Sequence, residues 1–442
     1  MSNKFIPHTE ADIKTMLDRI GLKSVDDLYS DVPQEVIFKE EYDIPSAMTE
    51  IELRRHFEEL GKKNSRLTVF AGGGAYDHYS PAAVAHLLQR SEFYTAYTPY
   101  QPEISQGTLQ YIFEYQSMIS ELTGMEATNA SMYDGATATA EAMFMMVASA
   151  KKRNRVVLSG TLTDAVIRVV ETYAHFHGIS VTVVAPKDGV SDQEAILKEM
   201  EAGDVAGVIV PCPNRYGIVE DFTGFADKIH ALKGFLTINA DPSALAVLRT
   251  PAEWGADAAV GDGQTLGMPL QFGGPYLGYI SCSKTMLRKM PGRAVGATKD
   301  IDGKRGYVLT LQAREQHIRR EKATSNICSN QSLMALYATI YLALMGKEGM
   351  KEVNRLSCDG AHYLYNKLIA TGKFEPAFPG KPFLKEFTLR TKLDMAKVNE
   401  KLLENGFMGP LVPGDGMAEF AVTEKRTREE IDRLVEIISK EA

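Results

Sequence analysis

The sequence predicts an α/β fold built on a mainly parallel sheet with helices on both faces. Its 442 residues are too many for one simple core and suit a large α/β domain with one or two smaller parts. From about residue 155 onward, short apolar segments alternate with helical ones. This alternation is typical of a parallel sheet covered on both sides. Beyond about residue 370 the pattern is strand, helix, strand, helix, which indicates a small α+β domain.

Residues 1–104 are predicted to form a helical N-terminal arm. Thr9 can cap a first helix whose apolar residues recur at helical spacing. Thr49 and Glu52 have the spacing of a capping box for a second helix, and Ser80-Pro81 can open a third. No alternating strand pattern occurs here, so we expect an arm or wrapping segment.

Residues 105–330 are predicted to form the large α/β domain. An amphipathic helix is expected at 109–122, and an Ala- and Met-rich helix at 135–150. The strands expected in this domain are 156–158, 181–184, 207–210, 235–238, 258–260 and 277–281, with helices at 164–177 and 225–232.

Residues 331–442 are predicted to form a connecting helix and a small C-terminal α+β domain. Helical periodicity begins near Gln316 and continues to about Ala370. Thr427 and Glu430 have the spacing of a capping box at the start of the last helix.

Composition excludes several classes of function. Hydrophobic residues make up 44% and charged residues 24%, as in ordinary folded proteins. The net charge is −8 and Lys and Arg are scattered, which argues against nucleic acid or an anionic membrane as a partner. No apolar run has the length of a membrane span, and no secretory leader is apparent. The four cysteines form no CxxC, so we expect reduced thiols in a cytoplasmic protein, without a metal site.

A run of small and polar residues from Ser131 to Thr137 precedes the helix expected at 135–150. Small residues at a helix start expose backbone N–H groups, so the run can form a phosphate cradle. The alternative is an Asp-capped, tightly packed helix. Taken alone, the run favours this alternative, because Asp134 would repel a phosphate.

A second candidate is the polar, glycine-rich loop that follows the strand expected at 258–260. A strand that runs into such a loop places it at the carboxyl edge of the sheet, where α/β proteins bind ligands. The glycines are equally consistent with ordinary turns. The loop contains Gln264 and no lysine.

Two further segments are candidates for recognition. Residues 94–107 include two prolines and three tyrosines, so fixed polar side chains can form the wall of a site. Composition alone favours a simple connector for this run. Residues 314–326 are densely charged and are either a solvated face or an anion-binding segment. Composition does not decide between these two.

In order and spacing, five runs are similar to runs of the glycine-decarboxylating P-protein family of the glycine cleavage system. They are 6–9, 97–101, 131–138, 253–257 and 319–326. Several runs in register are far more specific than one motif, and the resemblance covers nearly the whole chain. The family belongs to the pyridoxal-phosphate (PLP) enzymes of fold type I, with the aspartate-aminotransferase fold. It occurs as one long chain or as two subunits of about this length.

The two subunit types of that family differ at the cofactor. The cofactor-holding subunit has a His-Lys-Thr-Phe loop, whose lysine binds PLP covalently, and an upstream Asp that pairs with the ring nitrogen. Here the matching loop has Gln264 at the lysine position, and 238–241 reads Ile-Asn-Ala-Asp, with Ile238 or a neighbour at the Asp position. An amide has no usable nucleophilicity, and the ring nitrogen needs a carboxylate to stay protonated. The resemblance therefore implies the subunit without cofactor, with a vestigial cradle at Asp134, Gly135 and Thr137.

By resemblance, the assembled enzyme uses PLP to decarboxylate glycine and passes the aminomethyl group to the lipoyl arm of the H-protein. This chain is then expected to hold no PLP and to pair with the cofactor-bearing second subunit, with α2β2 as the family expectation. The residues expected in the wall of the site or lipoyl channel are Tyr97, Thr98, Tyr100, Gln101, Glu103 and Gln106. Those expected at the interface are Arg319, Arg320 and Lys322.

Two alternatives stay open. One is a stand-alone PLP enzyme that uses Lys284, Lys299 or Lys322. The other is a non-catalytic scaffold or regulator that kept the fold. Neither explains why the Tyr-Pro run and the charged segment survive beside a lost cofactor site, so the subunit hypothesis is preferred.

Overall fold

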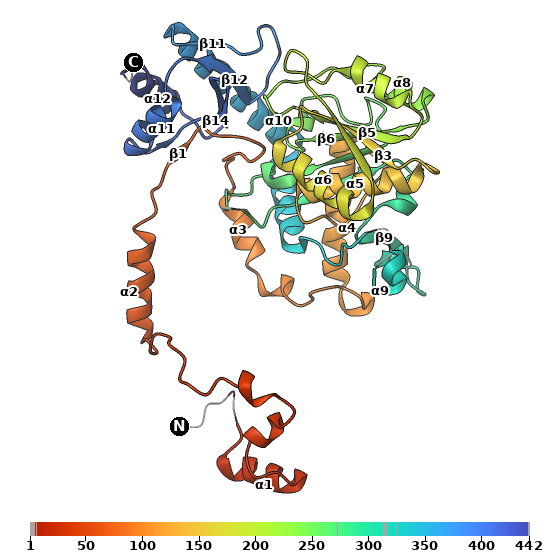
Figure 1. Cartoon of the computed structure of the whole chain (residues 1–442), viewed down its shortest axis with the longest axis vertical. Coiled ribbons are helices and arrows are strands. Elements are labelled where there is room, and N and C mark those ends of the chain that lie inside the picture. The colour runs from red at the N-terminus through yellow and green to blue at the C-terminus, as the bar shows by residue number, and fades with distance from the viewer. Residues whose placement is uncertain (1–4, 6, 272, 313–315, 324, 441–442) are drawn as a thin grey trace. The chain divides into compact units, whose positions relative to one another are not determined.

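The computed structural model describes residues 5, 7–271, 273–312, 316–323 and 325–440 (Figure 1). The chain forms two compact units, Met1–Ser65 and Arg66–Ala442. The boundaries predicted after residues 104 and 330 do not coincide with this division. The stretch after Arg66 joins the second unit, because β1 (Thr68–Val69) pairs in parallel with β13 (Phe407–Met408). The sequence did not predict this strand, and the three-part division stays a prediction.

The first unit consists of short helices joined by irregular segments. α1 (Glu10–Ile20) begins after Thr9 and α2 (Glu50–Gly61) after Thr49, each with a capping box. Both N-terminal caps were predicted from the sequence and are confirmed. Most apolar side chains of this unit are exposed. Two 3-10 turns lie between the helices, Asp26–Tyr29 and Gln34–Val36.

The second unit contains a seven-stranded sheet in the order β2-β8-β7-β6-β5-β3-β4. The five strands from β3 to β7 run parallel, and β8 is antiparallel to both β7 and β2. The bounds are β2 (Ala127–Thr128), β3 (Arg155–Ser159), β4 (Ser180–Val184), β5 (Val205–Cys212), β6 (Phe235–Ala240), β7 (Ala258–Asp262) and β8 (Gly278–Cys282). The predicted α/β class with a mainly parallel sheet is confirmed.

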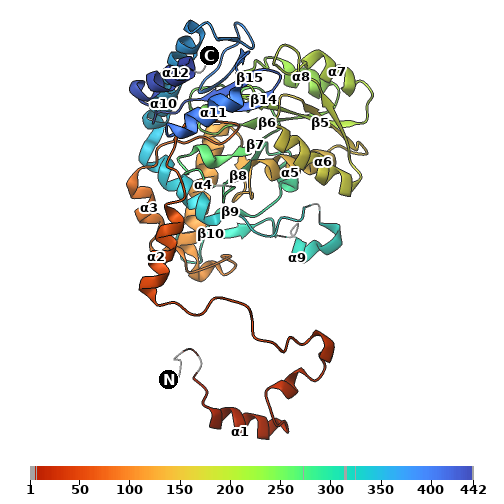
Figure 2. The same ribbon diagram turned by 60° about the vertical axis from the view of Figure 1, so that its left-hand side comes forward.

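Helices cover both faces of this sheet (Figure 2). Along β3, Val156 and Leu158 face one core and Val157 faces the other. This alternation is what a sheet buried on both faces requires. The first core includes α5 (Gly135–Ser149) and α6 (Asp164–His177). The second includes α4 (Gln106–Thr123), α7 (Gln193–Met200), α8 (Phe225–Ala231) and the start of α10 (Ser332–Ala370).

The connecting helix starts later than the sequence predicts. Instead of one helix from near Gln316, the chain forms α9 (Gln316–Arg319) and a 3-10 turn, and residues 325–331 before α10 have no regular structure. The cause is local anchoring. The backbone N–H groups of Cys328 and Ser329 donate to the Tyr133 hydroxyl, at 3.1 and 3.4 Å, and so point away from any helix.

A second, smaller sheet lies at the C-terminal end of the chain. Its four antiparallel strands have the order β11-β12-β15-β14 and share a core with α11, α12 and the end of α10. The predicted capping box of Thr427 and Glu430 is present at the start of α12. An unpredicted hairpin, β9 (Ala294–Lys299) with β10 (Arg305–Thr310), stands beside α4. The bounds of the small domain are β11 (Phe374–Pro376), β12 (Glu386–Thr391), α11 (Met395–Glu404), β14 (Leu411–Gly414), β15 (Met417–Ala421) and α12 (Arg428–Lys440).

Among the described residues, no helix is both long and apolar enough to cross a bilayer.

Candidate functional site

A cavity of ≈ 330 Å³ lies at the carboxyl ends of β5, β6 and β7. Its other walls are the N-terminus of α5, residues 73–76 and residues 384–386. In doubly wound α/β folds, ligands bind at this edge of the sheet, so the cavity is the candidate site within this chain. Its charged and amide-bearing lining residues are Asp134, Asn214, Arg215, Asn239, Asp241, Asp262, Lys385 and Glu386.

Gln264 lies in a 3-10 turn just after β7, and its side chain is fully buried. Its Oε1 accepts the N–H of Tyr76 at 2.8 Å. Its Nε2 donates to the carbonyl of Tyr76 at 2.8 Å and to that of Met268 at 2.7 Å. The amide thus pairs with the backbone of Tyr76 much as one strand pairs with another. It fastens the segment 73–76 beside the cavity and presents no amine.

The N-terminus of α5 is closed by two carboxylates. Asp134 Oδ1 accepts the N–H of Thr137 at 2.8 Å, and Asp262 Oδ2 accepts the N–H of Gly135 at 2.9 Å. Only glycine permits this approach, because a Cβ at Gly135 would lie 2.9 Å from the Cβ of Asp262. Burial raises the pKa of Asp262. The vestigial cradle predicted at Asp134, Gly135 and Thr137 is therefore filled by carboxylate oxygens of the chain itself.

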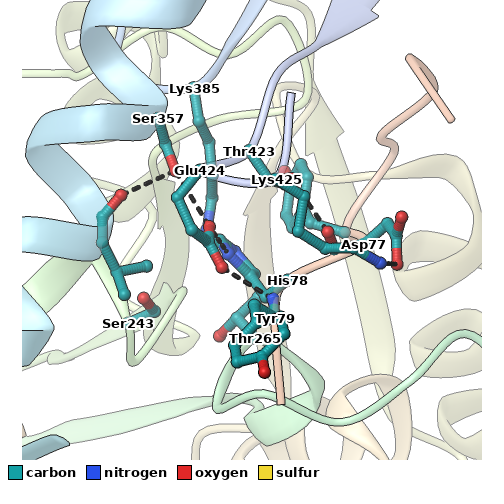
Figure 3. Close-up of polar contacts among 12 residues, drawn as sticks. Asp77, His78, Tyr79, Ser243, Thr265, Ser357, Lys385, Thr423, Glu424 and Lys425 are labelled. Carbon is teal, nitrogen blue, oxygen red and sulfur yellow. Dashed lines mark hydrogen bonds and ion pairs between the residues drawn. The ribbon is translucent and has the colours of Figure 1, made fainter. Parts of the chain in front are cut away.

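A buried charged network begins in the wall of the cavity, which includes Lys385 and Asp241. Lys385 pairs with Asp241 at 2.6 Å, and its Nζ lies 3.0 Å from Nε2 of His78. The other ring nitrogen of His78 lies 2.7 Å from Glu424. Figure 3 shows the side chains of Lys385, His78 and Glu424 directed toward one another. Burial and the charge of Lys385 lower the pKa of His78, so a neutral ring accepts from the ammonium group and donates to Glu424.

The side chains of this network were not predicted from the sequence. His78, Lys385 and Glu424 come from three separate segments, and no local motif connects them. The available signal is the pair Lys385-Glu386 directly before an apolar strand, since two charges at a buried strand start need partners.

Two carboxyl groups share a buried position next to the cavity. Glu386 accepts the N–H of Gly73 and the hydroxyl of Tyr76, both at 2.6 Å. Glu419 lies on β15, which pairs with β12. Burial and then the charge of Glu386 raise the pKa of Glu419 to about 9. At neutral pH, Glu419 is therefore protonated, and burial raises the pKa of Glu386 as well.

We expect Glu419→Gln to make the chain less sensitive to alkaline pH. The folded protein keeps the Glu419 proton up to about pH 9, whereas the unfolded chain loses it near pH 4.5. Stability therefore falls as pH rises between these values, because the folded state binds more protons. Glutamine cannot ionise, so the variant should melt roughly 2–4 °C above the wild type at pH 8.5, with the two values converging near pH 5. If the melting temperatures of the variant and the wild type differ by the same amount at every pH, the raised pKa of Glu419 is contradicted.

The predicted wall run lies on a different surface, away from this cavity. Tyr97 and Tyr100 are 84% and 51% exposed. Gln106, at the start of α4, holds the backbone of Tyr307 on β10, accepting its N–H and donating to its carbonyl at 2.9 Å each. None of the six predicted wall residues, Tyr97, Thr98, Tyr100, Gln101, Glu103 and Gln106, lines the cavity.

The predicted interface residues Arg319, Arg320 and Lys322 are exposed on α9 and the turn after it. They stand beside the wall run, since the ring of His317 lies 6.2 Å from that of Tyr100. The structure thus brings two segments far apart in sequence onto one surface. The start of the predicted charged segment, Arg314, lies outside the described residues.

The sheet order and the cavity at its carboxyl edge are typical of the α/β proteins that bind ligands at this edge of the sheet. A solved glutamate decarboxylase from Lactobacillus brevis has a TM-score of 0.68 at 13% identity, covering 94% of this chain and 98% of its own. At that identity the likeness shows the fold alone, which is fold type I of the PLP-dependent enzymes.

The particular family follows from closer matches. Residues 3–438 match the family described as the glycine cleavage system P-protein. A probable glycine dehydrogenase (decarboxylating) subunit 1 from Moorella thermoacetica is 52% identical over 437 residues, which is 98% of each chain. A crystal structure of glycine decarboxylase (P-protein) of the glycine cleavage system, in inhibitor-bound form, has a TM-score of 0.91 at 40% identity and covers 100% of both chains. The chain belongs to the glycine cleavage system P-protein family and is an enzyme subunit.

The residues of the cavity do not fit covalently held PLP, although the fold family implies that cofactor. The lysine in its wall, Lys385, is paired with Asp241. Two N–H groups at the start of α5, those of Gly135 and Thr137, already bond to Asp262 and Asp134. The lysines considered for a stand-alone enzyme are exposed and lie outside the lining of the cavity: Lys284, Lys299 and Lys322.

Proposed function

We propose that this chain is the non-cofactor subunit of a two-subunit glycine decarboxylase. The observation that carries the proposal is the buried amide of Gln264, which stands at the lysine position of the resemblance and is bonded at both ends to Tyr76. The related subunit 1 implies a second subunit, and in our proposal that partner holds PLP. The assembled enzyme decarboxylates glycine and passes the aminomethyl group to the lipoyl arm of the H-protein.

In this proposal, the chain contributes the exposed run around Tyr97, Tyr100 and Gln101 to a site shared with the partner. Prolines restrict the run, and Gln106 ties its end to β10. Fixed hydroxyl and amide groups at a surface suit a pocket that a second chain completes, because they orient a ligand at little cost in conformational entropy. An α2β2 assembly in the cytoplasm is part of the proposal.

Borohydride reduction of the chain, alone and with its presumed partner, tests the proposal. Mass spectrometry then locates the pyridoxyl-modified lysine, and decarboxylation of glycine is measured in parallel. We expect the label only on the partner and activity only when both chains are present. A label on this chain would establish a stand-alone enzyme instead. If no cofactor-bearing partner restores decarboxylation, the chain is a scaffold or regulator.

Tyr100→Phe and Gln101→Ala are expected to lower kcat/KM of the assembled enzyme roughly ten- to a hundredfold each, without preventing assembly. Each removes one polar contact to a charged or polar ligand, which has about this effect. Tyr94→Phe is the matched control, because Tyr94 is an exposed tyrosine of the same run outside the proposed wall. Activity and size-exclusion profiles are measured together. Full activity in both variants would remove the run from the site.

Reversal of the charges at Arg319, Arg320 and Lys322 to Glu is expected to weaken binding of the second subunit or to raise the KM for the H-protein. The three residues are exposed beside the proposed wall, so they meet whichever chain covers it. Lys198→Glu with Lys228→Glu, exposed on α7 and α8, serves as the control. Unchanged assembly and unchanged H-protein saturation would show that the segment is a solvated face.

A further inference from the structure

Arg293 is a buried cation to which no carboxylate of the described residues is paired. It precedes β9 and is 5% exposed. Within the part of the chain that the structure describes, Nε and Nη1 of its guanidinium have no hydrogen-bond partner and no carboxylate pairs with it. Arg155 shows the usual arrangement, with ion pairs to Glu199 and Asp204. Burial of an unpaired charge is costly, so the position of Arg293 calls for an explanation.

The side chain of Arg293 donates two hydrogen bonds, and one of them is to Tyr100 of the wall run. Its Nη2 donates to the carbonyl of Cys328 at 2.6 Å and to the hydroxyl of Tyr100 at 3.4 Å. Its Cζ also lies 5.7 Å from the centroid of the Tyr100 ring. The buried charge therefore lies next to a phenol that is itself partly open to solvent, since Tyr100 is 51% exposed.

The surface around Tyr100 is richer in cations than in carboxylates. Arg320 and Lys322 are exposed on the adjoining segment, and the ring of His317 contacts Tyr100. Among the described residues of the same two segments, the acidic ones are Glu103 and Glu321, which are also exposed, while Glu315 lies outside the described residues. With Arg293 next to it, the half-exposed side chain of Tyr100 lies in a field that favours an anion.

We propose that Arg293 positions the Tyr100 hydroxyl to donate a hydrogen bond to a carboxylate, namely that of the substrate glycine. This inference rests on the proposed function, which places the wall run in the shared site. The guanidinium occupies an oxygen lone pair of Tyr100 and polarises its O–H bond, so the phenolic proton is directed away from Arg293 toward the open side. Arg293 is thus a positioning residue that acts through Tyr100.

An arginine that acts on the substrate carboxylate through a tyrosine, and not directly, suits a decarboxylation. The carboxylate loses its charge as carbon dioxide leaves, so a direct ion pair with arginine would stabilise the substrate more than the transition state. The proton of a polarised phenol has only a partial positive charge, so it stabilises the bound carboxylate less than arginine would. The barrier to decarboxylation is then raised less. The contact is therefore expected to affect the KM for glycine more than kcat.

The test uses the assembled enzyme with Arg293→Met, Arg293→Lys, Tyr100→Phe and the double variant Tyr100→Phe/Arg293→Met. We expect Arg293→Met to raise the KM for glycine roughly ten- to a hundredfold, with a smaller change in kcat. Lysine keeps the charge and should give an intermediate KM. The double variant should be no worse than the poorer single variant, because both changes act through one hydroxyl. The melting temperature of the isolated Arg293→Met chain should equal or exceed that of the wild type, because an unpaired buried charge is removed.

The possible failures are distinguishable. An unchanged KM with a lowered melting temperature would show that Arg293 only holds the Cys328 carbonyl. Multiplicative effects in the double variant would show that it does not act through Tyr100. Either result, with an active wild-type pair, overturns this inference alone. A wild-type pair that does not decarboxylate glycine overturns the proposed function and this inference with it.

Discussion

Lys385→Met is expected to lower the free energy of unfolding by about 3–5 kcal/mol, because it leaves the Asp241 carboxylate buried without its cation. The side chains of the pair are 3% and 13% exposed, and their atoms lie 2.6 Å apart. Burial raises the pKa of Asp241, but the charge of Lys385 and the hydrogen bonds from Lys385 and Thr265 together outweigh it, so the net pKa is below its ordinary value. Denaturant unfolding followed by circular dichroism measures the loss.

The matched control is Lys425→Met. Lys425 pairs with Asp77 at the same 2.6 Å, but its side chain is 33% exposed and Arg426 also contacts Asp77. A loss of about 1 kcal/mol or less is expected there. Adding Asp241→Asn to Lys385→Met should recover part of the stability, because the uncompensated charge is removed. If Lys385→Met and Lys425→Met lower the free energy of unfolding equally, burial of the pair with Asp241 does not determine the loss of stability.

Gln264→Leu is the second change with a large expected effect, a loss of roughly 3 kcal/mol or more in the free energy of unfolding. Leucine has a similar size but leaves the N–H and carbonyl of Tyr76 and the carbonyl of Met268 without their partners. Gln271→Leu is the control, because its amide makes one exposed contact, to the carbonyl of Pro275. If both variants unfold at the same denaturant concentration, the amide does not fasten the segment at Tyr76.

Gln264→Lys separates this structural role from a restored cofactor site. The new amine cannot accept the Tyr76 N–H, so stability falls as it does in the leucine variant. The carboxylates of Asp134 and Asp262 still occupy the N–H groups of α5, so added PLP should give no absorbance of a bound cofactor. A yellow, borohydride-reducible variant would show that the glutamine alone had excluded the cofactor.

Much of the fold was predictable because its elements have strong local signals. The strands around residues 156–158 and 207–210 are short apolar runs, and α6 occupies exactly the expected range 164–177. The pairing of β1 with β13 was not predictable, because two-residue strands depend on a partner more than 300 residues away. The start of α10 was missed because side-chain acceptors at Tyr133 and Ser131 bind the backbone that a helix would use.

The candidate site was predictable only where a residue departs from a known pattern. Gln264 stands where the resemblance predicts a lysine, and Asp134 stands where its charge would repel a phosphate. The network of Lys385, His78 and Glu424 has no such marker, because its members are 307 and 346 positions apart in the chain. Arg293 has no marker in the sequence for a related reason: only the structure shows that no carboxylate among the described residues pairs with this buried arginine.

The bond between Gln264 and Tyr76 has a consequence for how the enzyme is made. In a PLP protein the cofactor stabilises the fold it binds, so supply of the cofactor affects the yield of folded chain. Here an amide of the chain itself ties down the segment beside the corresponding cavity. This subunit should therefore mature at the same rate in PLP-starved and PLP-replete cells, as a ready template onto which newly loaded partner chains assemble.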